Sequence, residues 1–388
     1  MQISDKVSQI TPSASITIAQ KVKEIKSQGT DVIGLHIGEP DFLPPKEALS
    51  STSEALLNGK VRYSNVAGEP EVLTKFKENY NSQHGTNISE ENLLISNGSK
   101  ASLYVLFQTI CNPGDEVILF SPYWITFPES IALAGAVPKV VETDDSCLPK
   151  VSDIEKSITD KTKVILLNSP SNPSGRVYPD SFWKEFAEFA KERDLYIISD
   201  EAYIDLYYSK EKPICLLAEY PHLADRLIIT QSFSKSFALT GFRLGVTIAS
   251  TVVIKAMNKL QGHLCGNNCT FSQYAINGAL DLDSSYLEAQ REEFKARLDV
   301  SYKILSRVLQ FDCPEGAFYL FPKVSEFILP GETDVELCRK FLEEEKVAIL
   351  PGSAFGKPGH VRISFTADKE VLRDAMTRFV SFLQRRKQ

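Results

Sequence analysis

This sequence of 388 residues has no long apolar stretch, no block of like charges and no regular pattern of cysteines. No apolar run approaches the ~18–20 residues that span a bilayer, and the N-terminal stretch lacks an apolar core of signal-peptide length. The net charge of −7, without a run of one sign, argues against a nucleic-acid or membrane partner. The seven cysteines include no CxxC pair, and the closest two, Cys265 and Cys269, are interpreted as buried or loop thiols. We therefore expect a cytoplasmic protein with reduced thiols and no metal.

What the sequence does contain is an alternation of short apolar runs with longer helical patterns. Strands this short and apolar, separated by helices, predict a largely parallel sheet that is covered on both faces. The expected strands are residues 92–96, 115–120, 135–143, 163–167, 195–199, 226–230 and 245–249. Helices are expected over 99–111 and 181–194.

The pattern changes after about residue 284. A long amphipathic helix is expected over roughly 284–310, and "GAFYLF" and "HVRISF" follow it and alternate like strands with one face in water. A chain of this length favours about two domains. We expect an N-terminal segment over 1–45 that completes part of a small domain, a large domain over 46–284, and a small C-terminal α+β domain over 285–388.

Polar side chains follow several of the expected strands at the points where the strands end. Ligands bind beyond the carboxyl ends of the strands in open α/β sheets, so we expect these side chains to gather. Ser99 and Lys100 open a helix, whose backbone N–H groups suit a phosphate. Asn172 lies in a loop whose path two prolines and a glycine fix. Asp200 follows a buried strand, where a carboxylate is costly without a cationic partner.

A single lysine in an apolar stretch follows the strand at 226–230. Ser232 and Ser234 come just before Lys235, and Arg243 follows in "SFSKSFALTGFRLG". An amine crowded by apolar groups and near another cation has a lowered pKa and forms Schiff bases with carbonyls. Arg243 offers a forked donor that suits a phosphate. The alternative for Lys235 is a solvated loop lysine.

One ligand uses all of these groups together, and that ligand is pyridoxal phosphate. Its aldehyde takes the lysine and its ring nitrogen takes the carboxylate. Its phenolic oxygen takes the amide and a tyrosine, and its phosphate takes the serines and the arginine. Taken singly, each group has an ordinary structural explanation, such as an arginine partner for Asp200 or a rigid connector around Asn172.

The motifs around these residues resemble the class I aminotransferases, the aspartate aminotransferase branch of the fold-type I pyridoxal-phosphate enzymes. The resemblance covers almost the whole chain in the order "GLHIGEPDF", "VRYSNVAGEPEV", "SPYW", "NSPSNPSGRVY", "SDEAY", "SFSKSFALTGFRLG" and "PGSAFG…VRISF". It implies an α/β fold whose large domain has a mostly parallel, seven-stranded sheet, beside a smaller α+β domain. It also implies transfer of an α-amino group between an amino acid and a 2-oxo acid, in a homodimer with shared active sites.

The resemblance further implies roles for the matching residues. Lys235 is expected to form the Schiff base and to move the substrate proton, and Asp200 to pair with the ring nitrogen. Tyr203 and Asn172 are expected to bond the phenolic oxygen, and Trp124 to stack on the ring and, with Asn172, to contact the substrate. The expected phosphate ligands are Ser99, Lys100, Ser232, Ser234, Arg243 and Tyr63 of the partner subunit.

The substrate is less closely defined than the cofactor. Arg362 is expected to clamp the α-carboxylate, and Gly38 to approach it through the backbone; an exposed strand arginine is the alternative for Arg362. The second substrate arginine of the family is absent from "HLCGNNCTFSQ", so Lys100, or Asn267 and Asn268 of the partner subunit, could read an acidic side chain. Aspartate with 2-oxoglutarate is the preferred pair, and aromatic, alanine-type or methionine-type amino acids are the alternatives.

Two other functions remain open on the sequence. A C–S β-lyase or a decarboxylase of the same fold would use the same lysine and carboxylate. A regulator with an aminotransferase-like domain behind a DNA-binding helix-turn-helix is the non-enzyme alternative. The resemblance begins within the first few residues, which leaves no room for such a DNA-binding domain, and the acidic net charge also disfavours it.

Overall fold

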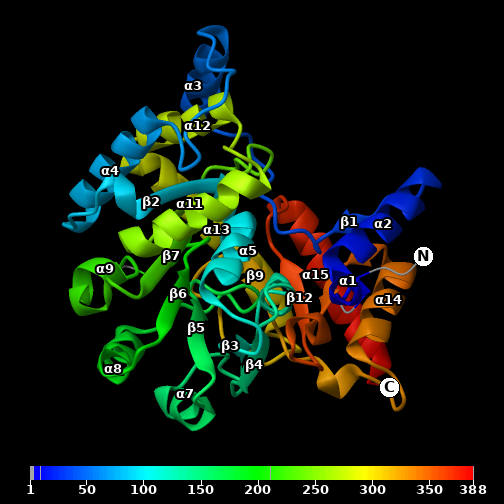
Figure 1. Cartoon of the computed structure of the whole chain (residues 1–388). Helices are drawn as coiled ribbons and strands as arrows, with labels where there is room; N and C mark the ends of the chain where they lie inside the picture. Colours follow the sequence, from blue (N-terminus) through cyan, green and yellow to red (C-terminus); the bar gives the residue numbers. More distant parts are fainter. Residues whose placement is uncertain (1–3, 9, 210, 388) are drawn as a thin grey trace.

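A computed structural model describes residues 4–8, 10–209 and 211–387, and its centre is a seven-stranded sheet (Figure 1). The strand order is β2-β8-β7-β6-β5-β3-β4. In this sheet β8 is antiparallel to both of its neighbours, and the other four pairings are parallel. The strands are β2 (Leu93–Asn97), β3 (Glu116–Ser121), β4 (Val137–Glu142), β5 (Thr162–Asn168), β6 (Tyr196–Asp200), β7 (Leu227–Ser232) and β8 (Leu244–Ile248). The predicted mostly parallel, seven-stranded sheet is confirmed.

Helices cover both faces of this sheet, which is why its strands are apolar along their whole length. On β7, Ile228 packs into the core below one face, while Leu227 and Ile229 pack into the core below the other. The first face is covered by α5 (Ser99–Ile110), α6 (Thr126–Leu133) and α11 (Thr251–Leu264). The second face is covered by α4 (Pro70–His84), α7 (Val151–Ser157), α8 (Asp180–Lys191) and α12 (Thr270–Leu280). Helix α3 (Lys46–Leu57) packs on α12, and Figure 1 shows the two together at one end of the molecule.

The C-terminal part forms a separate core with its own small sheet. Helices α13 (Ser284–Leu305) and α15 (Lys369–Arg386) pack together over strands β9 (Tyr319–Leu320), β11 (Leu350–Pro351) and β12 (Val361–Ser364), in the order β11-β12-β9. Helix α14 (Asp334–Glu345) joins the same core. The N-terminal segment belongs here, because β1 (Ile33–Gly34) pairs in parallel with β10 (Val347–Ala348). Figure 1 shows α1 (Asp5–Ser8) and α2 (Ala14–Ser27) beside these orange and red helices.

Short elements complete the connections. They are α9 (Leu216–Glu219), α10 (Phe233–Ser236), and the 3-10 turns η1 (Glu90–Asn92), η2 (Pro221–Leu223), η3 (Ser325–Phe327) and η4 (Gly352–Phe355). Of the described helices, none combines the length and the apolar character that crossing a bilayer requires.

Two expectations for the C-terminal part were wrong. The helix expected to about residue 310 ends at Leu305, and Leu309 enters the core from the turn that follows it. Strand β12 was expected to have one face in water, but all four of its residues are buried. Val361 and Ile363 face the C-terminal core, whereas Arg362, on the opposite face, bonds to residues of the large-sheet edge and the N-terminal segment.

Candidate active site

Asp200 is a buried carboxylate at the carboxyl end of β6. Its side-chain Oδ1 accepts a hydrogen bond from the backbone N–H of Ala202 at 3.0 Å. In the described part of the chain, no lysine, arginine or histidine nitrogen forms an ion pair with it. Burial raises the pKa of Asp200 to about 7. A carboxylate kept in such a place is suited to a cationic ligand group, because a neighbouring positive charge would offset its desolvation.

Asn168 aligns the loop after β5 with Asp200. Its side-chain Nδ2 donates to the carbonyl of Asp200 at 3.0 Å, and its Oδ1 accepts from the N–H of Asn172 at 2.9 Å. The parallel register places Asn168 directly beside Asp200. The two predicted residues Asp200 and Asn172 are therefore fixed relative to one another by a residue to which the sequence assigned no role.

Lys235 lies in the short helix α10, directly after β7. Its Nζ donates to the carbonyl of Gly38 at 2.7 Å and lies 6.0 Å from the ring centre of Tyr203 and 5.8 Å from that of Phe318. Burial, and then the positive charge of Arg362, lower the pKa of Lys235 to about 8. The lysine is therefore nearer to its neutral, nucleophilic form than a solvated lysine, as the sequence predicted.

Two serines shape the turn that carries Lys235. Ser232 ends β7 and caps α10, because its Oγ accepts from the N–H of Ser234 at 3.2 Å. Ser234 is buried and Ser232 is half-buried. Both serines lie within three residues of Lys235 at the carboxyl end of β7.

The N-terminus of α5 and Arg243 form a cradle for an anion. A Cβ added to Gly98, whose φ is +78°, would lie 2.5 Å from Nη2 of Arg243, so the guanidinium lies against the start of the helix that Ser99 begins. A Cβ on Gly245 would lie 2.5 Å from the N–H nitrogen of Ser99. Arg243 has a φ of 58°, a left-handed conformation that is strained for a residue with a side chain. Helix N–H groups and a forked cation suit a phosphate.

Arg362 is buried where three chain segments meet. Its Nη1 donates to Oδ1 of Asn172 at 3.0 Å, and its Nη2 donates to the carbonyl of His36 at 2.7 Å. Its guanidinium carbon lies 4.4 Å from the ring centre of Tyr319. Its Nε is buried and makes no hydrogen bond to the described residues. The alternative of an exposed strand arginine is therefore wrong, and a donor remains for an incoming carboxylate.

Tyr319 is a site residue that the sequence interpretation missed. Its hydroxyl shares a hydrogen bond of 2.7 Å with the hydroxyl of Tyr203, and both tyrosines are buried. A Cβ on Gly38 would lie 1.9 Å from the Tyr319 hydroxyl, so only glycine fits at this position. The signal in the sequence was weak, since Tyr319 lies in "GAFYLF", which has the pattern of an ordinary strand.

Trp124 and Lys100 lie together. The Nζ of Lys100 is 5.0 Å from the ring centre of Trp124, within the range of a cation–π contact. Lys100 also lies close enough to Lys235 for its charge to lower the pKa of that amine. The lysine therefore faces the same site as Arg243 and Arg362, which act on Lys235 in the same way.

The remaining predicted residues lie at the edge of the site or away from it. Asn267 and Asn268 line a cavity of about 830 Å³ together with Arg243 and Glu39 of the same chain. Tyr63 is 99% exposed within the single chain.

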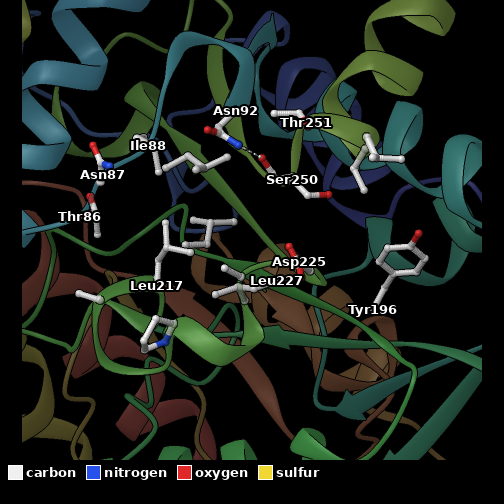
Figure 2. A pocket seen from close by; sticks show the side chains of 18 of the residues that line it. Thr86, Asn87, Ile88, Asn92, Tyr196, Leu217, Asp225, Leu227, Ser250 and Thr251 are labelled. Atoms are coloured by element: carbon white, nitrogen blue, oxygen red, sulfur yellow. Dashed lines mark hydrogen bonds between the residues drawn. The ribbon is translucent and has the colours of Figure 1, made fainter.

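A separate cavity of about 840 Å³ contains none of the predicted residues (Figure 2). Its lining comes from η1, η2, α9, the ends of β6, β7 and β8, and the start of α11. Asp225 and Tyr196 are its ionisable side chains, and neither faces a cluster of other charged groups. We assign the chemistry to the site around Lys235.

The donor groups of that site fit pyridoxal phosphate. An amine of lowered pKa, a buried carboxylate without a cation, a helix N-terminus beside an arginine, and two hydrogen-bonded tyrosines match the four polar parts of the cofactor. Among the described residues, no cluster of three His, Cys, Asp or Glu side chains is arranged to hold a metal ion.

Comparisons with known proteins agree with this geometry. The family model "Aminotransferase class I and II" matches residues 30–379. An aspartate aminotransferase of Bacillus subtilis is 37% identical over 99% of this chain and 100% of its own length, and one of Thermotoga maritima is 38% identical over 99% and 100%. The crystal structure of the Thermotoga maritima aspartate aminotransferase superposes with a TM-score of 0.92 at 37% identity, over 98% of this chain and 100% of that one. The aspartate aminotransferase from Thermus thermophilus with maleate gives 0.93 at 33% identity, over 98% and 100%. The chain thus belongs to the class I and II aminotransferase family and is a pyridoxal-phosphate-dependent transaminase of fold type I.

Proposed function

We propose that this transaminase moves the amino group between aspartate and 2-oxoglutarate. The observation that carries the proposal is a pair of cations whose charges both act on Lys235: Arg362 for the α-carboxylate and Lys100, over the ring of Trp124, for a side-chain carboxylate. A dicarboxylic substrate needs two such partners, and an aromatic or alanine-type substrate needs one. The related enzymes named above are aspartate aminotransferases, and one of them has been solved with maleate.

The roles of the residues follow from their chemistry. Pyridoxal phosphate, when bound, supplies an aldehyde and an electron-accepting ring. The amine of Lys235 would take the proton from the substrate Cα and pass it to the former aldehyde carbon of the cofactor, because its lowered pKa leaves a neutral fraction near neutral pH. Asp200 holds a proton on a neighbouring ring nitrogen, and Arg362 fixes the carboxylate end of the substrate with Asn172 and the Gly38 backbone beside it.

The other residues bind the cofactor. The N–H groups of Ser99 and Lys100, with Ser232, Ser234 and Arg243, would hold the phosphate. Tyr203 and Asn172 would bond the phenolic oxygen, and Trp124 would contact the ring of the cofactor. In terms of domains, we propose a cofactor-binding part over 46–284 and a small domain built from 1–45 and 285–388.

We further propose a homodimer in which Tyr63 completes the phosphate site of the partner subunit. Tyr63 is 99% exposed, and Leu57 and Leu43 are 85% and 83% exposed, which leaves large apolar and aromatic groups unburied in the single chain. Asn267 and Asn268 lie in the same region, where they could also contact a substrate. All seven cysteines are free thiols, which supports a reducing, cytoplasmic location.

The test is a panel of twenty amino acids, each with 2-oxoglutarate, and an assay with cystathionine. Glutamate formed fastest from aspartate supports the proposal. Best activity with an aromatic or alanine-type donor would contradict the substrate, and release of pyruvate and a thiol from cystathionine as the main reaction would indicate a C–S β-lyase instead.

A further inference from the structure

The loop over residues 60–69 is held firmly on both sides of an exposed tyrosine. The side chain of Tyr63 is 99% exposed, yet its two chain neighbours are tied to the body of the molecule. Oγ1 of Thr270 donates to the carbonyl of Arg62 at 2.7 Å, and Oγ of Ser64 donates to the carboxylate of Glu69. The backbone on both sides of Tyr63 is thus hydrogen-bonded to the rest of the molecule, while the Tyr63 side chain itself is almost fully exposed.

Glu69 is the centre of this arrangement. It is 8% exposed, and besides Ser64 its carboxylate accepts from the hydroxyl of Tyr274 at 2.9 Å and lies 3.6 Å from Nζ of Lys60. Its N–H donates to Oε1 of Gln273 at 2.8 Å. Lys60 and Ser64 lie on opposite sides of Tyr63 in the sequence. Glu69 therefore links the residues on both sides of Tyr63 and also bonds the loop to helix α12.

The same loop is joined to the strand that leads to the phosphate cradle. Nε2 of Gln261 donates to the carbonyls of Val66 and Ile95 at 2.8 and 2.9 Å, and the N–H of Ile95 donates to the carbonyl of Ala67 at 2.8 Å. Ile95 lies in β2, which ends just before Ser99. The segment that carries Tyr63 and the start of α5 are therefore parts of one hydrogen-bonded unit.

We propose that Glu69, together with Thr270, is a positioning residue that presents Tyr63 in a fixed orientation to the phosphate of pyridoxal phosphate in the partner subunit. The inference rests on the proposed homodimer with shared sites. A donor that is already ordered loses less conformational freedom when it binds, so the fixed loop strengthens phosphate binding without touching the phosphate itself. Glu69 should therefore affect cofactor binding in the active site of the partner subunit and not in the active site of its own subunit.

The first experiment measures retention of the cofactor, followed as loss of its visible absorbance on dilution. Glu69→Gln and Thr270→Val should each release pyridoxal phosphate about tenfold faster, because a displaced Tyr63 would lose its hydrogen bond to the charged phosphate. Tyr63→Phe should have the same effect, because it removes the hydroxyl that makes this bond. Sedimentation and circular dichroism should show folded dimers. The two variants remove contacts on opposite sides of Tyr63, so the test stays decisive if one of them folds poorly.

Glu90→Gln is the matched control. Glu90 also accepts from a lysine and a hydroxyl, Lys77 at 2.9 Å and Thr74 at 3.1 Å, but it touches no residue of the loop 60–69. Its cofactor retention should equal that of the unaltered protein. Normal retention in both Glu69→Gln and Thr270→Val, with a Tyr63→Phe defect, would overturn this inference alone. A monomer, or normal retention in Tyr63→Phe, would overturn the shared site as well.

The second experiment asks in which subunit Glu69 acts. Hybrid dimers are purified with two different tags, and Lys235→Ala marks one subunit so that the imine absorbance reports only the other. In a hybrid of Lys235→Ala/Glu69→Gln with an unaltered subunit, the reporting site receives Tyr63 from the altered loop and should lose the cofactor faster. In a hybrid of Lys235→Ala with Glu69→Gln, the reporting site receives Tyr63 from a normal loop and should retain the cofactor. The reverse pattern would show that Glu69 acts only within its own subunit and would overturn the proposal.

Discussion

Nη1 of Arg362 donates to the side-chain oxygen of Asn172 at 3.0 Å across 190 residues of sequence. This contact joins β12 of the C-terminal core to the loop after β5 of the large sheet, and Nη2 extends it to the carbonyl of His36. Arg362 is therefore held in place before any substrate binds. A carboxylate that meets a preoriented guanidinium gains binding energy without the cost of ordering it.

We predict that Arg362→Lys raises the KM for the amino acid about 100-fold or more, because an ammonium cannot reproduce the fork and leaves Asn172 or the substrate without a donor. Steady-state kinetics with aspartate checks this. The protein should still bind the cofactor and show its visible absorbance, since Arg362 is assigned to the substrate. Loss of the cofactor with an unaltered KM would contradict the assignment.

Lys100→Met should lower kcat/KM for aspartate about tenfold or more and leave alanine and aromatic donors nearly unaffected, because only a dicarboxylic substrate needs the second cation. Lys163→Met is the control: Nζ of Lys163 also lies near an aromatic ring, 5.9 Å from the centre of Tyr196, but away from the site. Equal losses for all donors would show that Lys100 serves the cofactor and not the substrate side chain.

Gly38→Ala should be inactive or nearly so, because the new methyl group would lie 1.9 Å from the Tyr319 hydroxyl and would displace the carbonyl that accepts from Lys235. Overpacking of this kind costs about 1–3 kcal/mol of stability. Thermal unfolding and turnover measure the two effects. Adding Tyr319→Phe should recover part of the loss, because it removes the closest atom.

Gly262→Ala is the control for that substitution. The nearest atom to a Cβ on Gly262, in helix α11, is an ordinary contact at 3.6 Å. Alanine favours a helix over glycine, so this variant should be as stable as the unaltered protein or slightly more so. A Gly38→Ala protein that behaves like Gly262→Ala would contradict the close fit at Tyr319.

The stability of the cofactor-free protein should depend on pH in two opposite ways. Burial raises the pKa of Asp200 from 3.8 to about 7, so between these values the folded protein holds a proton that the unfolded chain has lost, and this group makes the free energy of unfolding fall as pH rises. Burial lowers the pKa of His36 and of His84 to about 4, so these two groups oppose the fall between about pH 4 and 6.5. Burial and Arg362 lower the pKa of Lys235 from 10.5 to about 8, so between about pH 8 and 10.5 the unfolded chain holds the extra proton and stability rises with pH. Each group contributes at most about 1.4 kcal/mol per pH unit.

Urea unfolding across this range, with and without substitutions, measures both slopes. Asp200→Asn should weaken the fall below neutral pH, and Lys235→Ala should weaken the rise above it, to which Lys100 contributes as well because burial lowers its pKa too. Glu201, whose pKa burial raises to about 7, adds to the fall, so Glu201→Gln should weaken it too. A stability profile that none of these substitutions alters would contradict the burial of the charges.

The sequence predicted the sheet because its strands and helices follow local patterns, and the same patterns led to the candidate site. Asp200, Asn172 and Lys235 each follow an apolar strand, and parallel strands bring such ends to one edge. Tyr319 was missed because its contact with Gly38 joins segments from opposite ends of the chain, which only the packed C-terminal core brings together. The burial of β12 was misjudged for a related reason. An alternation of apolar and polar residues does not tell whether the polar face lies in water or, as with Arg362, is buried in a site. The role of Tyr63 stays a prediction, because it depends on a second chain.

The most direct test of the site is chemical trapping of the lysine. The protein is incubated with pyridoxal phosphate, reduced with borohydride, digested and analysed by mass spectrometry. We predict a pyridoxyl modification on Lys235 alone, with Lys100 unmodified, and loss of the visible absorbance in Lys235→Ala. A protein that stays colourless with pyridoxal phosphate, or that carries the modification on Lys100 and not on Lys235, would contradict the assignment of Lys235.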